Sequence, residues 1–237
     1  MTPRVSIVLP VYNEGESVVA CLDGLVAAVT TPFEILVVYD TRDDTTRPYA
    51  EKFAREDPRV VPTLNDYGRG PAKAIRYGLD HASAPVAVVT MADGSDEPEL
   101  IDGMVQRIEG GCVVVAASRY MRGGHQYGGP IVKSTFSRLA GLSLCWFARV
   151  GTHDATSSFK AYDTAFVRDV GVESDTGFTV ALELVAKARR RRRQVDEVPT
   201  TWRERTSGKS NFKTFEWLPK YFHWYFYAFG PKISEPA

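Results

Sequence analysis

The sequence is poor in cysteine, balanced in charge and without a long apolar run. Each of these features argues against one class of protein. Its three cysteines lie far apart in apolar stretches without metal-ligand spacing, and we expect buried thiols of a reduced compartment. The 237 residues carry 29 basic and 29 acidic side chains, which gives no reason to expect nucleic acid as a partner. No window reaches the roughly 18 apolar residues that a membrane span needs. Residues 1–4 lead directly into a strand pattern, which leaves no room for a signal peptide, so we expect a cytoplasmic protein, soluble or peripheral.

The first half of the chain alternates strand patterns with helix patterns. The predicted strands are 5–9, 34–39, 59–62, 86–90 and 112–117. The predicted helices are 16–29, 46–56, 71–82 and 99–109. Alternating units of this length predict an α/β fold with a mostly parallel, doubly wound sheet. The length and the 44% hydrophobic content fit one large domain, or one domain with an appendage.

The second half has a different character. A helix pattern at 131–150 mixes apolar and basic residues, and a strand (157–162), a helix (179–190) and a strand (195–199) follow. Nine aromatic residues then fall between Phe215 and Phe229. Such rings favour a membrane–water interface, although they would also serve to pack the tail onto the domain. The helix 131–150 has the same two interpretations: a membrane-surface helix, or an ordinary helix that covers the sheet.

Five consecutive arginines, 189–193, end one of these predicted helices. Cations at a helix C-terminus complement its dipole and its last carbonyl groups. Because the chain is otherwise neutral and has no nucleic-acid fold signature, we favour a solvated helix end attracted to anionic lipid over nucleic-acid binding.

An acidic loop, Met91 to Pro98, follows the apolar strand 86–90. Carboxylates at the C-terminal end of a parallel strand lie where open α/β sheets bind their ligands. Mg²⁺ takes one or two carboxylates and fills its other positions with substrate phosphates. The loop therefore predicts a metal–diphosphate site. The alternative is a polar turn in which Asp96 caps a helix that begins near Pro98.

Three further segments end or follow predicted strands at the same edge. Residues 10–14 offer a ring and a carboxylate, and residues 39–44 offer carboxylates that suit a base or a ribose. Residues 67–72 form a glycine-flanked helix N-terminus that suits an anion. Each segment alone is explained by turn chemistry, but four at corresponding strand ends indicate a nucleotide site.

Several motifs together resemble family 2 glycosyltransferases with the GT-A fold. The opening, Val-Ser-Ile-Val-Leu-Pro-Val-Tyr-Asn-Glu at 5–14, is similar to the start of that family. The order that follows resembles the polyprenyl-phosphate branch, typified by dolichol-phosphate mannose synthases. The segments that carry this resemblance are Ser-Arg-Tyr at 118–120 with Gly123-Gly124, Asp154 to Tyr162, Glu-Val-Pro at 197–199, and Arg205 to Ser210.

The resemblance implies roles for individual residues. The residues implied to bind the nucleotide sugar, a GDP- or UDP-sugar, are Pro10, Tyr12, Glu14, Asp40, Arg69 and Asp93. The candidate ligands of a divalent cofactor, Mg²⁺ or Mn²⁺, are Asp93, Ser95 and Asp96. The residues implied to hold the acceptor's phosphate are Arg119, Lys133, Ser137 and Arg205. Of these, Asp93, Arg119 and Arg205 are the candidate catalytic residues.

Two departures from the family pattern bear on the reaction. Met91 occupies the place of the first aspartate of the family's Asp-x-Asp metal motif, which leaves Asp93 as the second. Residues 158–160 read Ser-Phe-Lys where relatives that glycosylate a hydroxyl carry an acidic general base. A phosphate monoester needs no base because it is already anionic, and it needs cations that position it.

The resemblance implies an inverting enzyme that moves mannose or glucose to a polyprenyl, dolichyl-type phosphate. We expect a GT-A catalytic domain at 1–212 and an aromatic tail at 213–237 that lies on the cytoplasmic face of a membrane. The C-terminal transmembrane helices of some members are not matched, which leaves a membrane partner subunit open. The alternatives are a soluble transferase acting on a small acceptor and a non-catalytic nucleotide-sugar-binding subunit, for which Met91 is the best argument.

Overall fold

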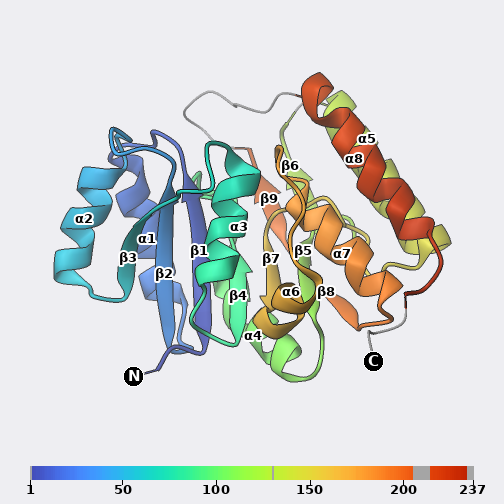
Figure 1. Cartoon of the computed structure of the whole chain (residues 1–237), viewed down its shortest axis with the longest axis horizontal. Coiled ribbons are helices and arrows are strands. Elements are labelled where there is room, and N and C mark those ends of the chain that lie inside the picture. The colour runs from blue at the N-terminus through green and yellow to red at the C-terminus, as the bar shows by residue number, and fades with distance from the viewer. Residues whose placement is uncertain (1, 130, 205–213, 234–237) are drawn as a thin grey trace.

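Apolar strands and amphipathic helices alternate along the chain and build one sheet with a helical layer on each face (Figure 1). The computed structural model describes residues 2–129, 131–204 and 214–233, with the backbone alone at 131–133 and 214–216. The seven strands lie in the order β3-β2-β1-β4-β7-β5-β8. They are β1 (Val5–Val11), β2 (Phe33–Tyr39), β3 (Val60–Leu64), β4 (Val86–Val89), β5 (Val114–Ser118), β7 (Lys160–Asp163) and β8 (Val195–Pro199). Only β7 runs antiparallel to its neighbours, so the predicted mostly parallel α/β fold is confirmed.

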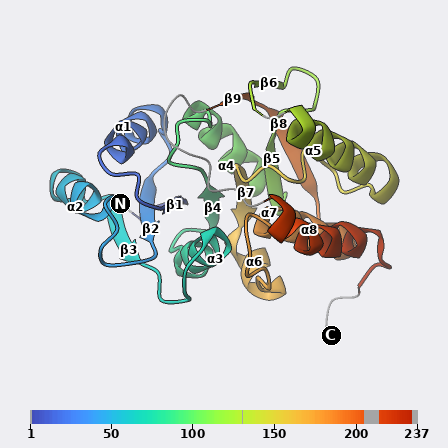
Figure 2. The ribbon, with the colours of Figure 1, turned by 90° about the horizontal axis from the view of Figure 1, so that it is seen from above.

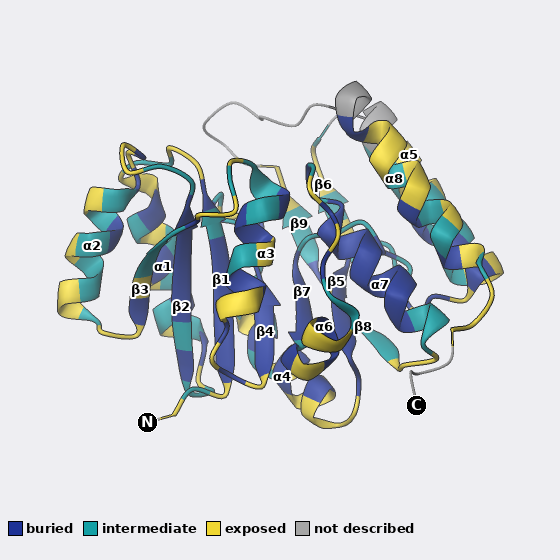
Figure 3. Cartoon of the chain, viewed as in Figure 1, coloured by how far each residue is buried: buried dark blue, intermediate teal, exposed yellow. Residues whose placement is uncertain are grey.

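The helices cover both faces of the sheet. The helical elements are α1 (Ser17–Ala28), α2 (Arg47–Glu56), α3 (Pro71–His81), the 3₁₀ turn η1 (Pro98–Leu100), α4 (Ile101–Glu109), α5 (Ile131–Ser143), the π-helical η2 (Leu144–Ala148), α6 (Thr164–Val170), α7 (Val180–Arg190) and α8 (Thr214–Phe229). One apolar cluster packs α1, α2 and α4 against the sheet, and a second packs α3, α6, α7 and α8 on the other face (Figure 2). The inner strands β1, β2, β4, β5 and β7, together with α7, are the most deeply buried elements (Figure 3).

A close approach between α3 and β1 depends on a glycine. A Cβ atom at Gly78 would lie 2.3 Å from a methyl carbon of Val8, well inside van der Waals contact. The missing side chain therefore lets α3 lie directly on the inner strand β1.

Three short elements were not predicted. Strands β6 (His125–Tyr127) and β9 (Thr201–Arg203) form a separate two-stranded parallel sheet. Helix α6 begins after Asp163, whose carboxylate accepts hydrogen bonds from the backbone N–H groups of Ala165 and Phe166. This side chain is an ordinary N-cap, so the helix carried a readable start signal.

The aromatic tail forms α8, which lies beside α5 (Figures 1 and 2). Trp224 is buried against the apolar cluster of α7, and the Tyr225 hydroxyl shares a hydrogen bond with that of Ser143. Phe222 and Phe226 are exposed. One face of the helix thus packs onto the domain and the other faces outward. Within the described residues, no helix is long and apolar enough to cross a bilayer.

The arginine run at the end of α7 holds the segment that follows α8. The Arg189 guanidinium donates to the carbonyl oxygens of Ala148 and Gly230, and Arg190 donates to that of Pro231. Arg192 and Arg193 are exposed. The helix end is therefore only partly solvated, because two of its cations bind backbone carbonyl groups of neighbouring segments.

Candidate functional site

The loops after β1 and β2 are tied together at the C-terminal edge of the sheet. The buried carboxylate of Asp44 accepts the backbone N–H of Asn13 at 3.1 and 3.2 Å and that of Thr46 at 2.8 Å. In return, the Asn13 side chain accepts the N–H of Thr45. Asn13 adopts a left-handed φ of 55°, and the neighbouring Tyr12 is left exposed at the edge. Asp44 belongs to the segment 39–44 that was expected to offer carboxylates to a ligand, but its carboxylate holds the loop instead, as an aspartate two residues before a threonine at a helix start commonly does.

Asp40 shapes the loop that leads into α3. Its two carboxylate oxygens accept hydrogen bonds from the Asn65 side-chain amide at 2.8 Å and from the Gly70 N–H at 2.7 Å. Gly70 has a φ of 117°, which favours glycine, and it immediately precedes the helix. The preceding Arg69 is exposed. The structure thus places Asp40 and Arg69 at one loop, as the predicted nucleotide site requires.

The acidic loop is held by Asp96, which accepts hydrogen bonds from residues that precede it in the chain and not from the helix that follows. One oxygen of Asp96 accepts the Thr90 hydroxyl at 2.9 Å and the Met91 N–H at 3.0 Å. The helix starts at η1 and α4 have no side-chain cap, so the alternative that Asp96 caps a helix is wrong. The Asp93 carboxylate accepts the N–H of Ser95, which is buried.

Two of the three carboxylates of this loop, those of Asp93 and Asp96, fit a divalent cation. Burial, together with the negative charge of Asp93, raises the pKa of Asp96 to about 6, against the lowering effect of its hydrogen bonds and of Arg119. A hard cation would relieve this repulsion, and Ser95 adds an oxygen. Within the described residues, no group of three or more His, Cys, Asp and Glu side chains could hold a metal alone. Met91 packs against the apolar cluster on the α3 face instead.

A buried ion pair lies at the end of β5. The Arg119 guanidinium donates to both oxygens of Asp154, at 2.7 and 2.9 Å, and the Arg119 N–H adds a third bond. The Asp154 side chain is fully buried and that of Arg119 is 15% exposed. Although burial alone would raise it, the charge and hydrogen bonds of Arg119 hold the pKa of Asp154 below its usual range. The carboxylate is therefore a fixed anchor for the guanidinium and a poor proton acceptor.

Hydroxyl groups surround this ion pair. The Ser137 hydroxyl, on α5, lies 3.4 Å from an Arg119 nitrogen, 3.2 Å from the Tyr120 hydroxyl and 2.7 Å from the Thr156 hydroxyl. The structure thus brings together Arg119 and Ser137, two of the four predicted phosphate-binding residues. Such a cation with converging hydroxyl donors suits a phosphate group.

The sequence of the chain is similar to that of proteins of one known family. The family model described as "Glycosyl transferase family 2" matches residues 6–171. The chain belongs to this family. It is 28% identical over 232 residues to a polyprenol monophosphomannose synthase of Mycolicibacterium smegmatis, covering 91% of this chain and 87% of the relative. It is 29% identical over 213 residues to an undecaprenyl-phosphate mannosyltransferase of Micrococcus luteus. This match covers 87% of this chain and 86% of the relative.

Solved structures support the fold of this family 2 glycosyltransferase. The glucosyl-3-phosphoglycerate synthase of Mycobacterium tuberculosis, solved with Mn²⁺, uridine diphosphate and phosphoglyceric acid, matches with a TM-score of 0.67 at 16% identity. The match covers 97% of this chain and 79% of that one. The GT-A architecture expected from the sequence is therefore confirmed.

The remaining predicted site residues of the glycosyltransferase are placed in part. Pro10 lies in β1, one residue before its end, and Glu14 lies in the loop that follows, where its N–H donates to the Thr46 hydroxyl at 2.9 Å. Lys133 lies one helical turn before Ser137 on α5, and its side chain is outside the described part of the chain. Arg205 lies outside the described residues. The roles of Asp93, Arg119 and the other site residues stay predictions.

Lys160 of the family 2 enzyme lies beneath the ion pair. Its fully buried ammonium donates to the carbonyl oxygens of Asp154 and Ser157, and burial lowers its pKa to about 7. Lys160 therefore fixes the backbone turn from which Asp154 projects. In the sequence, Lys160 stands out only as part of the segment 158–160 that carries no acidic base.

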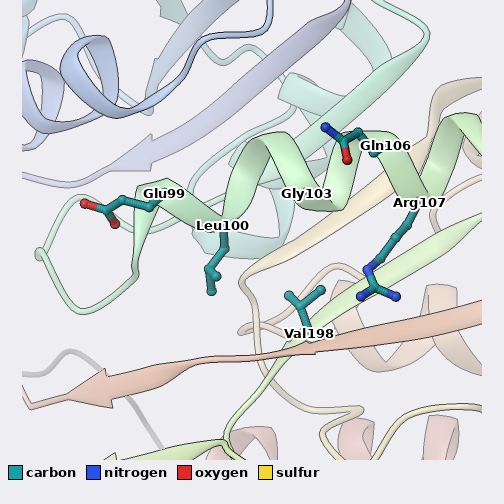
Figure 4. Close-up of a pocket in the computed structure, with 6 residues that line it drawn as sticks. All are labelled: Glu99, Leu100, Gly103, Gln106, Arg107 and Val198. Atoms are coloured by element: carbon teal, nitrogen blue, oxygen red, sulfur yellow. The ribbon is translucent and has the colours of Figure 1, made fainter.

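A groove of about 370 Å³ on the glycosyltransferase lies apart from these residues (Figure 4). It runs between η1–α4 and the edge strand β8 and is lined by Glu99, Leu100, Gly103, Gln106, Arg107 and Val198. Among the described residues of the predicted site, none lines it.

Proposed function

We propose that the protein transfers a hexose, mannose or glucose, from a GDP- or UDP-sugar to a polyprenyl phosphate at the cytoplasmic face of a membrane. One observation carries this proposal. Helix α5 places Ser137 beside the anchored Arg119 and also exposes Phe136, which is 70% exposed, one residue away. A phosphate-binding cation thus adjoins an exposed apolar surface, and a lipid phosphate combines the same two chemical features. The names of both relatives favour mannose as the sugar.

The reaction needs an oriented nucleophile rather than a base. Residues 158–160 contain no carboxylate, and the pKa of Asp154 is held below its usual range. A phosphate oxygen held by Arg119 and Ser137 attacks the anomeric carbon, and the bond from that carbon to the nucleoside diphosphate breaks. A divalent cation bound at Asp93, with Ser95 and Asp96 as further ligands, would neutralise charge on the departing diphosphate. The charge of Arg119 also lowers the pKa of Asp96, which supports a site in which the acceptor and donor groups lie near one another.

The donor and the acceptor are tested by a matrix of substrates. GDP-mannose, GDP-glucose, UDP-mannose and UDP-glucose are each incubated with Mg²⁺ or Mn²⁺ and a short polyprenyl phosphate, and products are detected by mass. We expect one donor to yield a polyprenyl-phosphate hexose, and no product from the matching polyprenol, which lacks the phosphate. Transfer to 3-phosphoglycerate instead would favour a soluble enzyme with a small acceptor. Nucleotide binding without turnover would favour a non-catalytic subunit.

The membrane surface is the outward face of α5, η2 and α8. Its exposed apolar side chains are Phe136, Leu139, Trp146, Phe147, Leu218, Phe222, Phe226 and Phe229. Arg138, Arg149 and Lys220 are exposed among them. Rings with basic neighbours at such a face suit a phospholipid interface. Three free thiols also agree with a reduced compartment.

Membrane binding is tested by flotation with phospholipid vesicles that contain an anionic lipid. Replacing Phe147, 75% exposed on η2, with serine should weaken partitioning by about tenfold, because a buried ring contributes roughly 1.5–3 kcal/mol. The triple change Trp146→Ser, Phe147→Ser and Phe226→Ser should abolish flotation. The matched control is Val61→Ser, because Val61 is 38% exposed on β3 at the opposite end of the sheet. A wild-type protein that does not float would contradict the proposal and favour a membrane partner subunit as the anchor.

A further inference from the structure

Thr200 forms a junction between three segments of the acceptor side. It lies between β8 and β9 and is buried. Its N–H donates to the carbonyl oxygen of Ser118 at 3.2 Å, and its carbonyl oxygen accepts the N–H of His125 at 2.9 Å. Ser118 directly precedes Arg119, and His125 begins β6. Any displacement of Thr200 therefore reaches both the end of β5 and the start of β6.

The acidic loop is fixed to this junction by Glu97. One oxygen of the Glu97 carboxylate accepts the Thr200 hydroxyl at 2.9 Å and the Thr201 N–H at 2.7 Å. Glu97 comes directly after Asp96 and four residues after Asp93, and its partners are more than 100 residues further along the chain. The Glu97 carboxylate thus joins the loop that carries the candidate metal ligands to the acceptor side.

Strands β6 and β9 extend the junction toward α5 (Figures 1 and 2). We call residues 121–129 and 200–204 the flap. Beyond the strand pairing, the Glu204 N–H donates to the Tyr127 carbonyl oxygen and the Glu204 carboxylate accepts the Gly129 N–H at 2.8 Å. Gln126 then reaches α5, where its amide donates to the Ser134 hydroxyl at 2.6 Å. Ser134 is one turn before Ser137, so the flap ends at the predicted phosphate-binding helix.

We propose that Glu97 is a positioning residue that couples occupancy of the donor diphosphate site to the placement of the flap and of the acceptor phosphate. The proposal rests on the function proposed above. A cation and diphosphate that pull on Asp93 and Asp96 move the loop in which Glu97 lies. The hydrogen bonds of Glu97 transmit this movement to Thr200, and the backbone hydrogen bonds of Thr200 transmit it to Ser118 and His125. Occupancy of the donor site thereby sets the positions of Arg119 and of the flap relative to the acceptor phosphate. Glu97 itself contacts neither substrate.

The kinetic test compares variants of the full chain. Glu97→Ala should raise the KM for polyprenyl phosphate by about tenfold, because two hydrogen bonds to a charged group are lost, and should leave the KM for the sugar nucleotide nearly unchanged. Thr200→Val should have the same effect, and adding it to Glu97→Ala should bring no further loss. Glu97→Gln keeps an accepting oxygen and should restore most of the acceptor affinity. The matched control is Glu99→Ala, an exposed carboxylate of the same loop region.

A second measurement does not depend on transfer. Hydrogen exchange at the amides of His125, Gly129 and Glu204, none of which bonds to Glu97, is followed with Mn²⁺ and either GDP or UDP. We expect the nucleotide to slow exchange at these amides in the wild type and in Glu99→Ala, and not in Glu97→Ala or Thr200→Val. Exchange that slows equally in every variant, or a Glu97→Gln defect as large as that of Glu97→Ala, overturns the proposal. A protein that shows the exchange response without transfer would overturn the proposed reaction and leave the coupling standing.

Discussion

Replacing Asp93 with alanine should lower the rate of sugar transfer by about a thousandfold, the loss typical of removing one electrostatic contact to developing charge. Asp93 is the one acidic residue that matches the family's metal motif, since Met91 packs into the apolar core. Its carboxylate forms only one hydrogen bond with the loop, from the Ser95 N–H, so the fold should tolerate the change. The rate is measured under saturating donor, with Mg²⁺ or Mn²⁺ varied.

The control for this change is Glu99→Ala, which removes the same charge from an exposed position just beyond the loop. It should keep the wild-type rate and the wild-type dependence on metal. A chelator added to the wild type should reproduce the loss seen in Asp93→Ala. Transfer at the wild-type rate by Asp93→Ala would remove Asp93 from the site and leave the acidic loop without its proposed role.

Replacing Asp154 with asparagine should destabilise the protein by about 3–5 kcal/mol, because it leaves the guanidinium of Arg119 buried without a counter-charge. This is a large part of the 5–15 kcal/mol that holds a typical domain folded. Denaturant unfolding, monitored by fluorescence, measures the loss. Transfer should fail as well, since Arg119 loses the two oxygens that orient it.

The chain offers a matched control for this ion pair. Arg4 makes the same two-nitrogen contact with Glu109 at the surface, where the two side chains are 55% and 34% exposed. Glu109→Gln should shift the unfolding midpoint little, because water and salt screen an exposed pair. If Asp154→Asn is as mild as Glu109→Gln, the buried pair does not have the proposed importance.

The contribution of the Arg119–Asp154 pair to the free energy of unfolding should decrease as the pH falls. The pKa of Asp154 is lowered from 3.8 in the folded protein, so the folded state favours the carboxylate. Its contribution is complete above the ordinary carboxyl pKa and is lost as the pH falls below it. The stability difference between the wild type and Asp154→Asn should therefore shrink on acidification.

The sequence predicted the sheet and its ligand-binding edge because both depend on local pattern. Apolar runs of five to seven residues separated by helices predict parallel strands, and polar residues after such strands must meet at one edge. The acidic loop, Asp40 and the Arg69 loop were found in this way. The family resemblance added Arg119 and Ser137, which the structure brings within 3.4 Å of each other.

What the sequence did not show are contacts between distant segments. Strands β6 and β9 have three residues each, too few for a readable alternation, and pair across about 75 residues. Asp154 was visible as part of a motif, but its partner Arg119 lies 35 residues earlier in the chain. For Asp96, a cap on the following helix was the alternative to a metal ligand, and the structure shows no such cap. The direction in which Asp96 bonds depends on a side-chain rotamer that the sequence does not encode locally.

The antiparallel strand β7 has a consequence for how the molecule is made. Strands β1 to β4 all lie within the first 89 residues, and β1, β2 and β3 pair only with strands of this group. Strand β5, in contrast, has β7 and β8 as neighbours, and both are synthesised after it. Pairings of such long sequence separation form late. As the chain leaves the ribosome, strands β1 to β4 can therefore pair with one another while β4 still lacks β7 and β5 is still an unpaired strand. The two halves of the site arise in a fixed temporal order, and the second depends on the arrival of residues 160–199.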